Sequence, residues 1–146
     1  MRLATYNVEW FANLFDNEDQ LMVDDELSGR EGVTRARQIE ALGKVFTALE
    51  RRGNPWGLPG RKRLAWAEGL DFPVPVVGVD VPDAADLDCL FWVGCAGAYD
   101  ERGQQVARAV AELLHVAGVR FAVLGDGETC TGDPARRAGN EALFQQ

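Results

Sequence analysis

The sequence predicts an α/β fold built around a parallel strand–helix–strand unit between residues 86 and 140. Two short runs of aromatic, β-branched and other apolar residues, Leu90–Val93 and Val119–Leu124, are typical of strands buried on both faces. Helical periodicity fills the stretch between them, from the N-cap residue Asp100 to the C′ residue Gly118. A connection of this length joins parallel neighbours by a right-handed crossover.

The helix of this unit is expected to bury one apolar stripe. Its members recur at helical spacing and are Val106, Val110, Leu113, Leu114 and Ala117. The residues 94–97 between the first strand and this helix are small, which predicts a tight loop.

The first 50 residues predict a strand followed by a helix. Residues 2–10 alternate as a strand does, and residues 13–32 are acidic and irregular, as in an exposed loop. The spacing then predicts a helix over residues 34–49. Its buried stripe is Ile39, Leu42, Val45, Phe46 and Leu49.

The composition of the chain changes at residue 51, so we place a domain boundary between residues 50 and 51. Residues 51–60 are rich in Gly and Pro and therefore irregular, and residues 61–69 predict a short helix. Residues 71–82 contain three prolines, which suits an extended edge or linker but not a central strand. The basic residues between Arg51 and Arg63 are interpreted as a solvated surface.

Composition restricts the class of protein. The net charge of −8 argues against general nucleic-acid binding, which depends on Lys and Arg at phosphates. No apolar run approaches the roughly 20 residues of a membrane span, and the N-terminus lacks the pattern of a secretory signal. A cytoplasmic location is the resulting expectation. An odd number of cysteines, three, does not indicate a disulfide framework.

Two of the cysteines are predicted to lie close together. Cys95 follows the first strand of the central unit, and Cys130 lies in the loop after the second. Parallel neighbours present these loops at one sheet edge, where open α/β sheets bind ligands. Cys89, inside the first strand, is interpreted as a core residue, and His115 as a surface residue near a helix end.

The opening of the chain resembles the start of the endonuclease/exonuclease/phosphatase family. The resemblance rests on Thr5–Trp10 and the following helix, and it stops at Glu50. It implies that Asn7 matches the asparagine near the metal centre of that family. The later histidine and aspartate motifs of the family do not follow, so a truncated and inactive phosphoesterase is retained only as an alternative.

Residues 53–146 resemble a second family, the CCG-type cysteine-rich iron–sulfur proteins related to heterodisulfide reductase. The matching segments are Asn54–Gly57, Trp66–Asp71, Leu90–Gly97, Glu128–Asp133 and Pro134–Glu141. The resemblance implies that Cys95 and Cys130 bind an iron–sulfur cluster, for which we consider the [4Fe–4S] type, and that Arg136 and Arg137 offset its negative charge. It also implies electron transfer with redox protein partners or other subunits.

Two departures from the family pattern affect this expectation. Thr131 stands where the fuller motif has a second adjacent cysteine, and no Cys-x-x-Cys follows before Gln146. Since a [4Fe–4S] cluster normally takes four cysteine thiolates, the ligand set of this chain is predicted to be incomplete. The two resemblances together predict a truncated nuclease-like start, residues 1–50, joined to a truncated iron–sulfur module, residues 51–146.

The prediction is therefore a partial electron-transfer module of an oxidoreductase, with no catalytic residue of its own. A folded fragment that binds nothing is the other alternative. Cys130 and Arg136 also have the Cys-x₅-Arg spacing of cysteine phosphatases, but Pro134 lacks an N–H for phosphate and Asp133 would repel it.

Overall fold

A computed structural model describes Asp16, Glu18 and residues 20–26 and 32–146 of the chain. It divides the chain into two compact units: residues 1–51 with 132–146, and residues 52–131. The strand expected at residues 2–10, which includes Asn7, lies outside the described residues. The expected boundary at 50/51 separates two family resemblances and stays a prediction.

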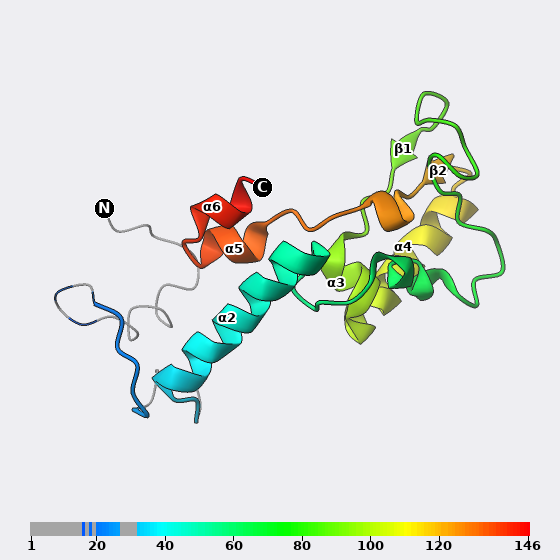
Figure 1. Cartoon of the computed structure of the whole chain (residues 1–146). Helices are drawn as coiled ribbons and strands as arrows, with labels where there is room; N and C mark the ends of the chain where they lie inside the picture. Colours follow the sequence, from blue (N-terminus) through cyan, green and yellow to red (C-terminus); the bar gives the residue numbers. More distant parts are fainter. Residues whose placement is uncertain (1–15, 17, 19, 27–31) are drawn as a thin grey trace. The chain divides into compact units, whose positions relative to one another are not determined.

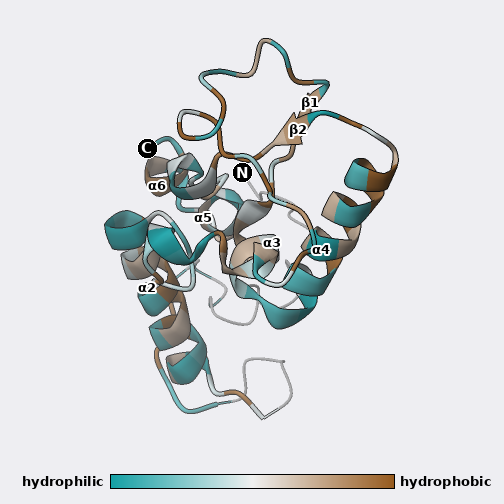
Figure 2. Cartoon of the chain, turned by 90° about the vertical axis from the view of Figure 1, so that its right-hand side faces the viewer, coloured by the Kyte–Doolittle hydropathy of each residue, from teal (hydrophilic) through white to brown (hydrophobic). Residues whose placement is uncertain are grey.

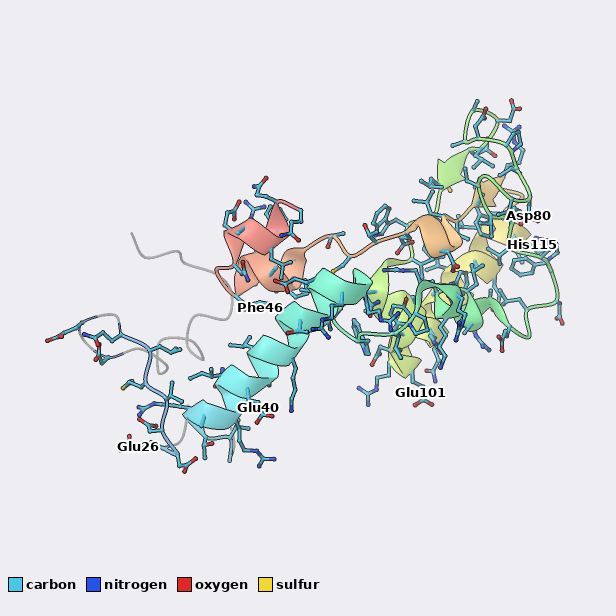
Figure 3. All side chains as sticks on the ribbon, in the orientation of Figure 1. Glu26, Glu40, Phe46, Asp80, Glu101 and His115 are labelled. Carbon is cyan, nitrogen blue, oxygen red and sulfur yellow. The ribbon has the colours of Figure 1, made fainter. Side chains whose placement is uncertain are left out.

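The first unit contains the long helix α2, Arg35–Arg52, whose last residue lies in the second unit. Its start is held by Thr34, whose hydroxyl accepts a hydrogen bond from the Arg37 N–H at 3.4 Å. The predicted stripe is confirmed: Leu49 is buried and its other four members are half-buried, Phe46 among them, while Glu40 is exposed (both labelled in Figure 3). Local periodicity is thus sufficient to predict the buried face of α2.

The described part of this unit also contains two short helices, α5 (Asp133–Arg137) and α6 (Glu141–Phe144). The Asn140 side chain caps α6 by accepting from the Leu143 N–H at 3.1 Å. Arg136 lies over the Phe144 ring at 4.8 Å, and Arg137 pairs with Asp133 at 2.9 Å. Both arginines that the sequence assigned to cluster charge therefore have partners inside their own unit.

The second unit is built on a parallel pair of short strands (Figure 1). Strand β1 is Cys89–Leu90 and β2 is Phe121–Ala122, with Cys89 opposite Phe121. The predicted parallel crossover is confirmed, but both strands are shorter than expected. Residues 121–123 are buried, whereas Leu90 and Trp92 are 41% and 45% exposed, so the expectation that the first strand is buried on both faces was wrong.

The Pro-containing segment after residue 70 forms the other edge of this small sheet. Val76 pairs with Val123 in a parallel bridge, in which the Val77 N–H donates to the Val123 carbonyl at 3.0 Å. The expectation of an extended edge or linker in residues 71–82 is therefore confirmed around Val76, where the segment forms an edge, whereas residues 78–80 form a turn.

Two helices connect β1 to β2, namely α3 (Gly94–Tyr99) and α4 (Glu101–Val116). Residues 94–97, expected as a tight loop, are the first turn of α3. Asp100 caps α4 as predicted, accepting from the Gly103 N–H at 2.9 Å. At the other end, Gly118 has φ +70°, and Val119 N–H donates to the Leu114 carbonyl at 3.0 Å, as in a Schellman motif.

The buried face of α4 differs from the prediction. Ala107 and Ala111 are fully buried, whereas Val106 and Leu113 are 64% and 70% exposed. The reason is the close approach of α4 to α3: a Cβ at Gly103 would overlap the carbonyl of Ala96. The smallest side chains of α4 therefore face inward, although Figure 2 colours parts of α4 as hydrophobic.

The core of this unit surrounds Trp66, which is completely buried. Its ring meets the Phe91 ring edge-on at 5.9 Å. Packed in the same cluster are Ala107, Ala111, Phe121 and Val123. Trp66 belongs to a 3₁₀ turn, η2 (Ala65–Ala67), and a second 3₁₀ turn, η1 (Gly60–Lys62), precedes it. The two turns lie where the sequence predicted one short helix, residues 61–69.

Candidate functional site

Cys95 occupies the second position of α3, directly after the turn that ends the first strand segment. Gly94, the first helical residue, has φ +74°, a left-handed conformation that glycine adopts without strain. This backbone reversal brings the Cys95 side chain to the carboxyl end of β1, the edge that the sequence analysis predicted.

Cys130 follows β2 through the 3₁₀ turn η3, Gly125–Gly127. Its backbone N–H donates to the Gly53 carbonyl at 2.8 Å. The loop after Gly53 is in turn organised by Asn54, a fully buried side chain that accepts from the Leu58 N–H at 3.1 Å and donates to the Leu58 carbonyl at 2.7 Å. The Asn54–Gly57 motif thus supports the loop that carries Cys130.

The two thiols are neighbours within the second unit. Burial raises the pKa of Cys95 to about 11, the Arg63 guanidinium opposes that rise, and the Cys130 thiol adds to it through charge and a hydrogen bond. The expectation that the crossover brings the two cysteine loops together is confirmed, since Glu128, two residues before Cys130, accepts hydrogen bonds from Val93 and Gly94, next to Cys95. The role of the cysteines as ligands stays a prediction.

A buried ion pair adjoins the thiols, and the sequence analysis did not predict it. Arg63 and Glu128 have side chains that are 4% and 3% exposed, and their charged atoms are 3.0 Å apart. The interpretation of Arg51–Arg63 as a solvated surface is correct for the exposed residues Arg51, Arg52, Arg61 and Lys62 but wrong for Arg63. Only the position of Glu128, two residues before Cys130, could have indicated a role in the site.

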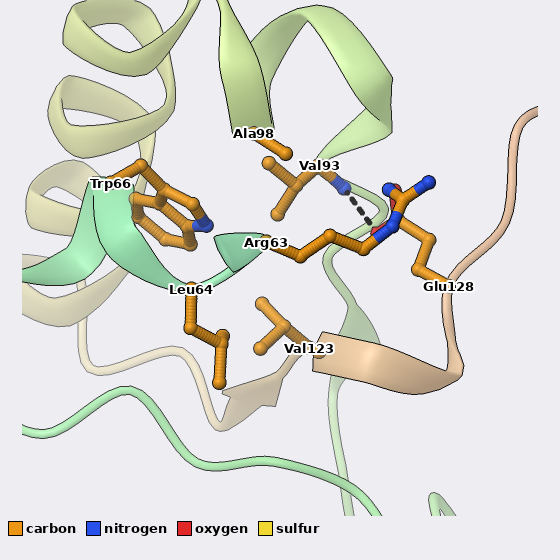
Figure 4. A pocket seen from close by; sticks show the side chains of 8 residues that line it. Arg63, Leu64, Trp66, Val93, Ala98, Val123 and Glu128 are labelled. Atoms are coloured by element: carbon orange, nitrogen blue, oxygen red, sulfur yellow. Dashed lines mark hydrogen bonds and ion pairs between the residues drawn. The ribbon is translucent and has the colours of Figure 1, made fainter. Parts of the chain in front are cut away.

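The Glu128 carboxylate also binds the turn before Cys95. It accepts hydrogen bonds from the backbone N–H groups of Gly94 at 2.7 Å and Val93 at 3.1 Å. Figure 4 shows this carboxylate meeting both the Arg63 guanidinium and the backbone at Val93. One side chain therefore ties the two cysteine loops together.

The other residues considered from the sequence lie outside this cluster. Cys89 is half-buried against the core, as part of β1. His115 is exposed and stacks on the Phe72 ring at 4.0 Å. Trp66 is a core residue, whereas Trp56 and Trp92 are both about half exposed.

The donor chemistry at Cys95 and Cys130 fits an iron–sulfur group. Thiolates are the usual ligands of such clusters, and two thiols lie together here with a guanidinium beside them. In the described part of the chain, no group of three or more His, Cys, Asp or Glu side chains is arranged to hold a metal ion. Cys95 and Cys130 fit two positions of a four-thiolate ligand set.

None of the helices described in the structure has both the length and the apolar character needed to cross a membrane.

Comparison with known proteins identifies related sequences. Residues 89–146 match the CCG family model, described as a cysteine-rich domain. The chain is 45% identical over 115 residues to a probable iron-sulfur-binding oxidoreductase, FadF, of Bacillus subtilis, an alignment that covers 78% of this chain and 16% of that protein. It is 40% identical over 101 residues to the EtfAB:quinone oxidoreductase of Syntrophomonas wolfei, covering 69% of this chain and 14% of that protein.

A third relative is one of the subunits of the dihydromethanophenazine:CoB–CoM heterodisulfide reductase of Methanosarcina barkeri. It is 33% identical over 86 residues, which cover 59% of this chain and 18% of that protein. The chain thus spans less than a fifth of each of these relatives. No solved structure matches the chain. The resemblance of residues 1–50 to the endonuclease/exonuclease/phosphatase family finds no support among these matches.

Proposed function

We propose that residues 51–146 form an iron–sulfur electron-transfer module of an oxidoreductase. Cys95 and Cys130 would supply two thiolate ligands. The observation that carries the proposal is the convergence of the two cysteine loops, which are joined by the hydrogen bonds of Glu128 to the N–H groups of Val93 and Gly94. The family match and the iron-sulfur-binding relative support an iron–sulfur cluster as the cofactor.

The surroundings of the thiols suit this role. Both cysteines are half-buried, so a bound group would be shielded from bulk water on one side and remain accessible on the other. The guanidinium of Arg63 contributes positive charge at Cys95, where two thiolates would otherwise repel each other. The bound group would accept and release single electrons, and the protein would orient its ligands.

Two thiolates account for half of the ligand set of a [4Fe–4S] cluster. We propose that the remaining ligands come from protein outside residues 1–146, in a further segment or in another subunit. The relatives include a protein named as a subunit of a heterodisulfide reductase, which supports a place in an assembly with redox protein partners.

Anaerobic reconstitution with iron and sulfide tests the proposal. We expect the wild-type chain to take up more iron and acid-labile sulfide than the Cys95→Ser and Cys130→Ser variants, each of which lacks one of the two proposed ligands. Cys89→Ser is the matched control, because Cys89 belongs to β1 and packs against the core. Its iron content should equal that of the wild type.

Equal iron content in all four proteins would refute the ligand assignment. A cooperative thermal melt of the wild-type chain without uptake of iron would instead favour the alternative, a folded α/β unit that binds no cluster.

A further inference from the structure

Arg63 is a buried cation with a fixed direction. Moving a charge out of water is costly unless it is paired, and the Arg63 side chain, 4% exposed, is paired with Glu128 at 3.0 Å. The planar guanidinium cannot rotate freely while one nitrogen is held by a carboxylate. The Tyr99 ring lies under the same guanidinium at 5.3 Å, which restricts it further.

The free end of this fork points at a sulfur atom. Arg63 Nη2 donates to Cys95 Sγ at 3.3 Å, while Nη1 donates to Glu128. Glu128 itself accepts from the N–H groups of Val93 and Gly94, so the carboxylate is fixed to the backbone that carries Cys95. The donor and the sulfur are therefore held by one continuous network.

We propose, on the basis of the proposed function above, that Arg63 is a positioning residue that makes the reduction potential of the bound cluster less negative. Hydrogen bonds to ligand sulfurs and nearby positive charge stabilise the more negative, reduced form of an iron–sulfur cluster. The guanidinium forms or breaks no covalent bond. The single electron comes from the external redox partner.

The role of Glu128 is to hold this donor in place. Because the carboxylate binds Nη1, the Nη2 group is left to donate a charge-assisted hydrogen bond to the sulfur. A lysine at position 63 would keep the charge but could not bind the carboxylate and the sulfur with the same rigid fork.

The test compares reduction potentials of the reconstituted full chain. Redox titration monitored by electron paramagnetic resonance is applied to the wild type, Arg63→Lys, Arg63→Met and the double variant Arg63→Met with Glu128→Gln. The double variant removes both buried charges, which keeps the experiment informative if Arg63→Met alone fails to fold. Arg120→Met is the matched control, because Arg120 forms an exposed ion pair with Asp88 in the same unit.

We expect a more negative midpoint potential in both Arg63→Met proteins, a smaller negative shift in Arg63→Lys and no shift in Arg120→Met, at equal iron content. Unchanged potentials in the iron-loaded Arg63 variants, or an equal shift in Arg120→Met, would overturn this inference and leave the proposed function intact. Loss of iron from Arg63 variants that melt like the wild type would also overturn it, since Arg63 would then retain the cluster. A wild-type chain without a cluster would refute the proposed function, and this inference with it.

Discussion

The two ends of the parallel pair β1–β2 carry the same kind of ion pair in opposite environments. At the amino end, Arg120 and Asp88 are 2.9 Å apart and their side chains are 65% and 46% exposed. At the carboxyl end, Arg63 and Glu128 are 3.0 Å apart and almost completely buried. The distances are nearly equal, so distance alone does not distinguish a surface contact from a structural one.

The difference lies in what else each pair binds. The Asp88 carboxylate accepts from the backbone and side chain of Arg120, and its side chain is about half exposed to solvent. Glu128 joins two cysteine loops and orients an arginine toward a sulfur. A buried pair is costly to form, and its position next to the two thiols supports the proposed cluster site at the carboxyl end of the strand pair.

The largest expected effect is the loss of the buried cation. Arg63→Met leaves the Glu128 charge unpaired in the interior, and removing one partner of a buried pair costs about 3–5 kcal/mol of unfolding free energy. Chemical denaturation of the metal-free protein measures this loss. Adding Glu128→Gln should restore part of the stability, and a double variant as unstable as Arg63→Met would contradict this account.

A smaller loss is expected from Gly103→Ala, which tests the support of the helix that carries Cys95. The new Cβ would overlap the Ala96 carbonyl and push α4 away from α3, with a cost of roughly 1–3 kcal/mol. The matched control is Gly43→Ala on α2, where nothing lies within 4 Å. Since alanine favours a helix, this control should gain about 0.5–1 kcal/mol. Equal thermal shifts in both variants would show that the α3–α4 contact does not constrain the fold.

The carboxyl end of the β1–β2 pair should also make the stability of the protein depend on alkaline pH. The pKa of Cys95 is raised in the folded state from an ordinary 9.0 to about 11, mainly by burial. The unfolded chain therefore loses this proton first, and the stability of the metal-free protein should fall as the pH rises from about 9 to about 11. Denaturation measured at several pH values across this range should show a weaker dependence of stability on pH for Cys95→Ser. A Cys95→Ser protein with the wild-type pH profile would exclude the thiol as the cause.

The smallest effect is expected at the amino end. Arg120 lowers the pKa of Asp88, so the pair stabilises the fold above the ordinary pKa of that carboxyl and loses its contribution as the pH falls. Both groups are exposed, so Asp88→Asn should change the melting temperature little, and added salt should reduce the difference further. A loss as large as that of Arg63→Met would remove the contrast between the two ends.

Several features of this protein could be read from the sequence because they depend on local interactions. The stripe of α2, the Asp100 cap and the Gly118 C′ residue involve neighbours within one or two helical turns. The adjacency of Cys95 and Cys130 was also predictable, since a parallel crossover has one standard arrangement.

Other features were decided by the tertiary structure. The periodicity of α4 favoured a stripe containing Val106 and Leu113, but the close approach to α3 at Gly103 selected the face with Ala107 and Ala111. Arg63 belongs to a basic run that is otherwise exposed, and it is buried because Glu128, 65 positions away, is available to pair with it. Periodicity and capping report the preferences of a segment, whereas the burial of a charge depends on a partner that only the folded chain brings close.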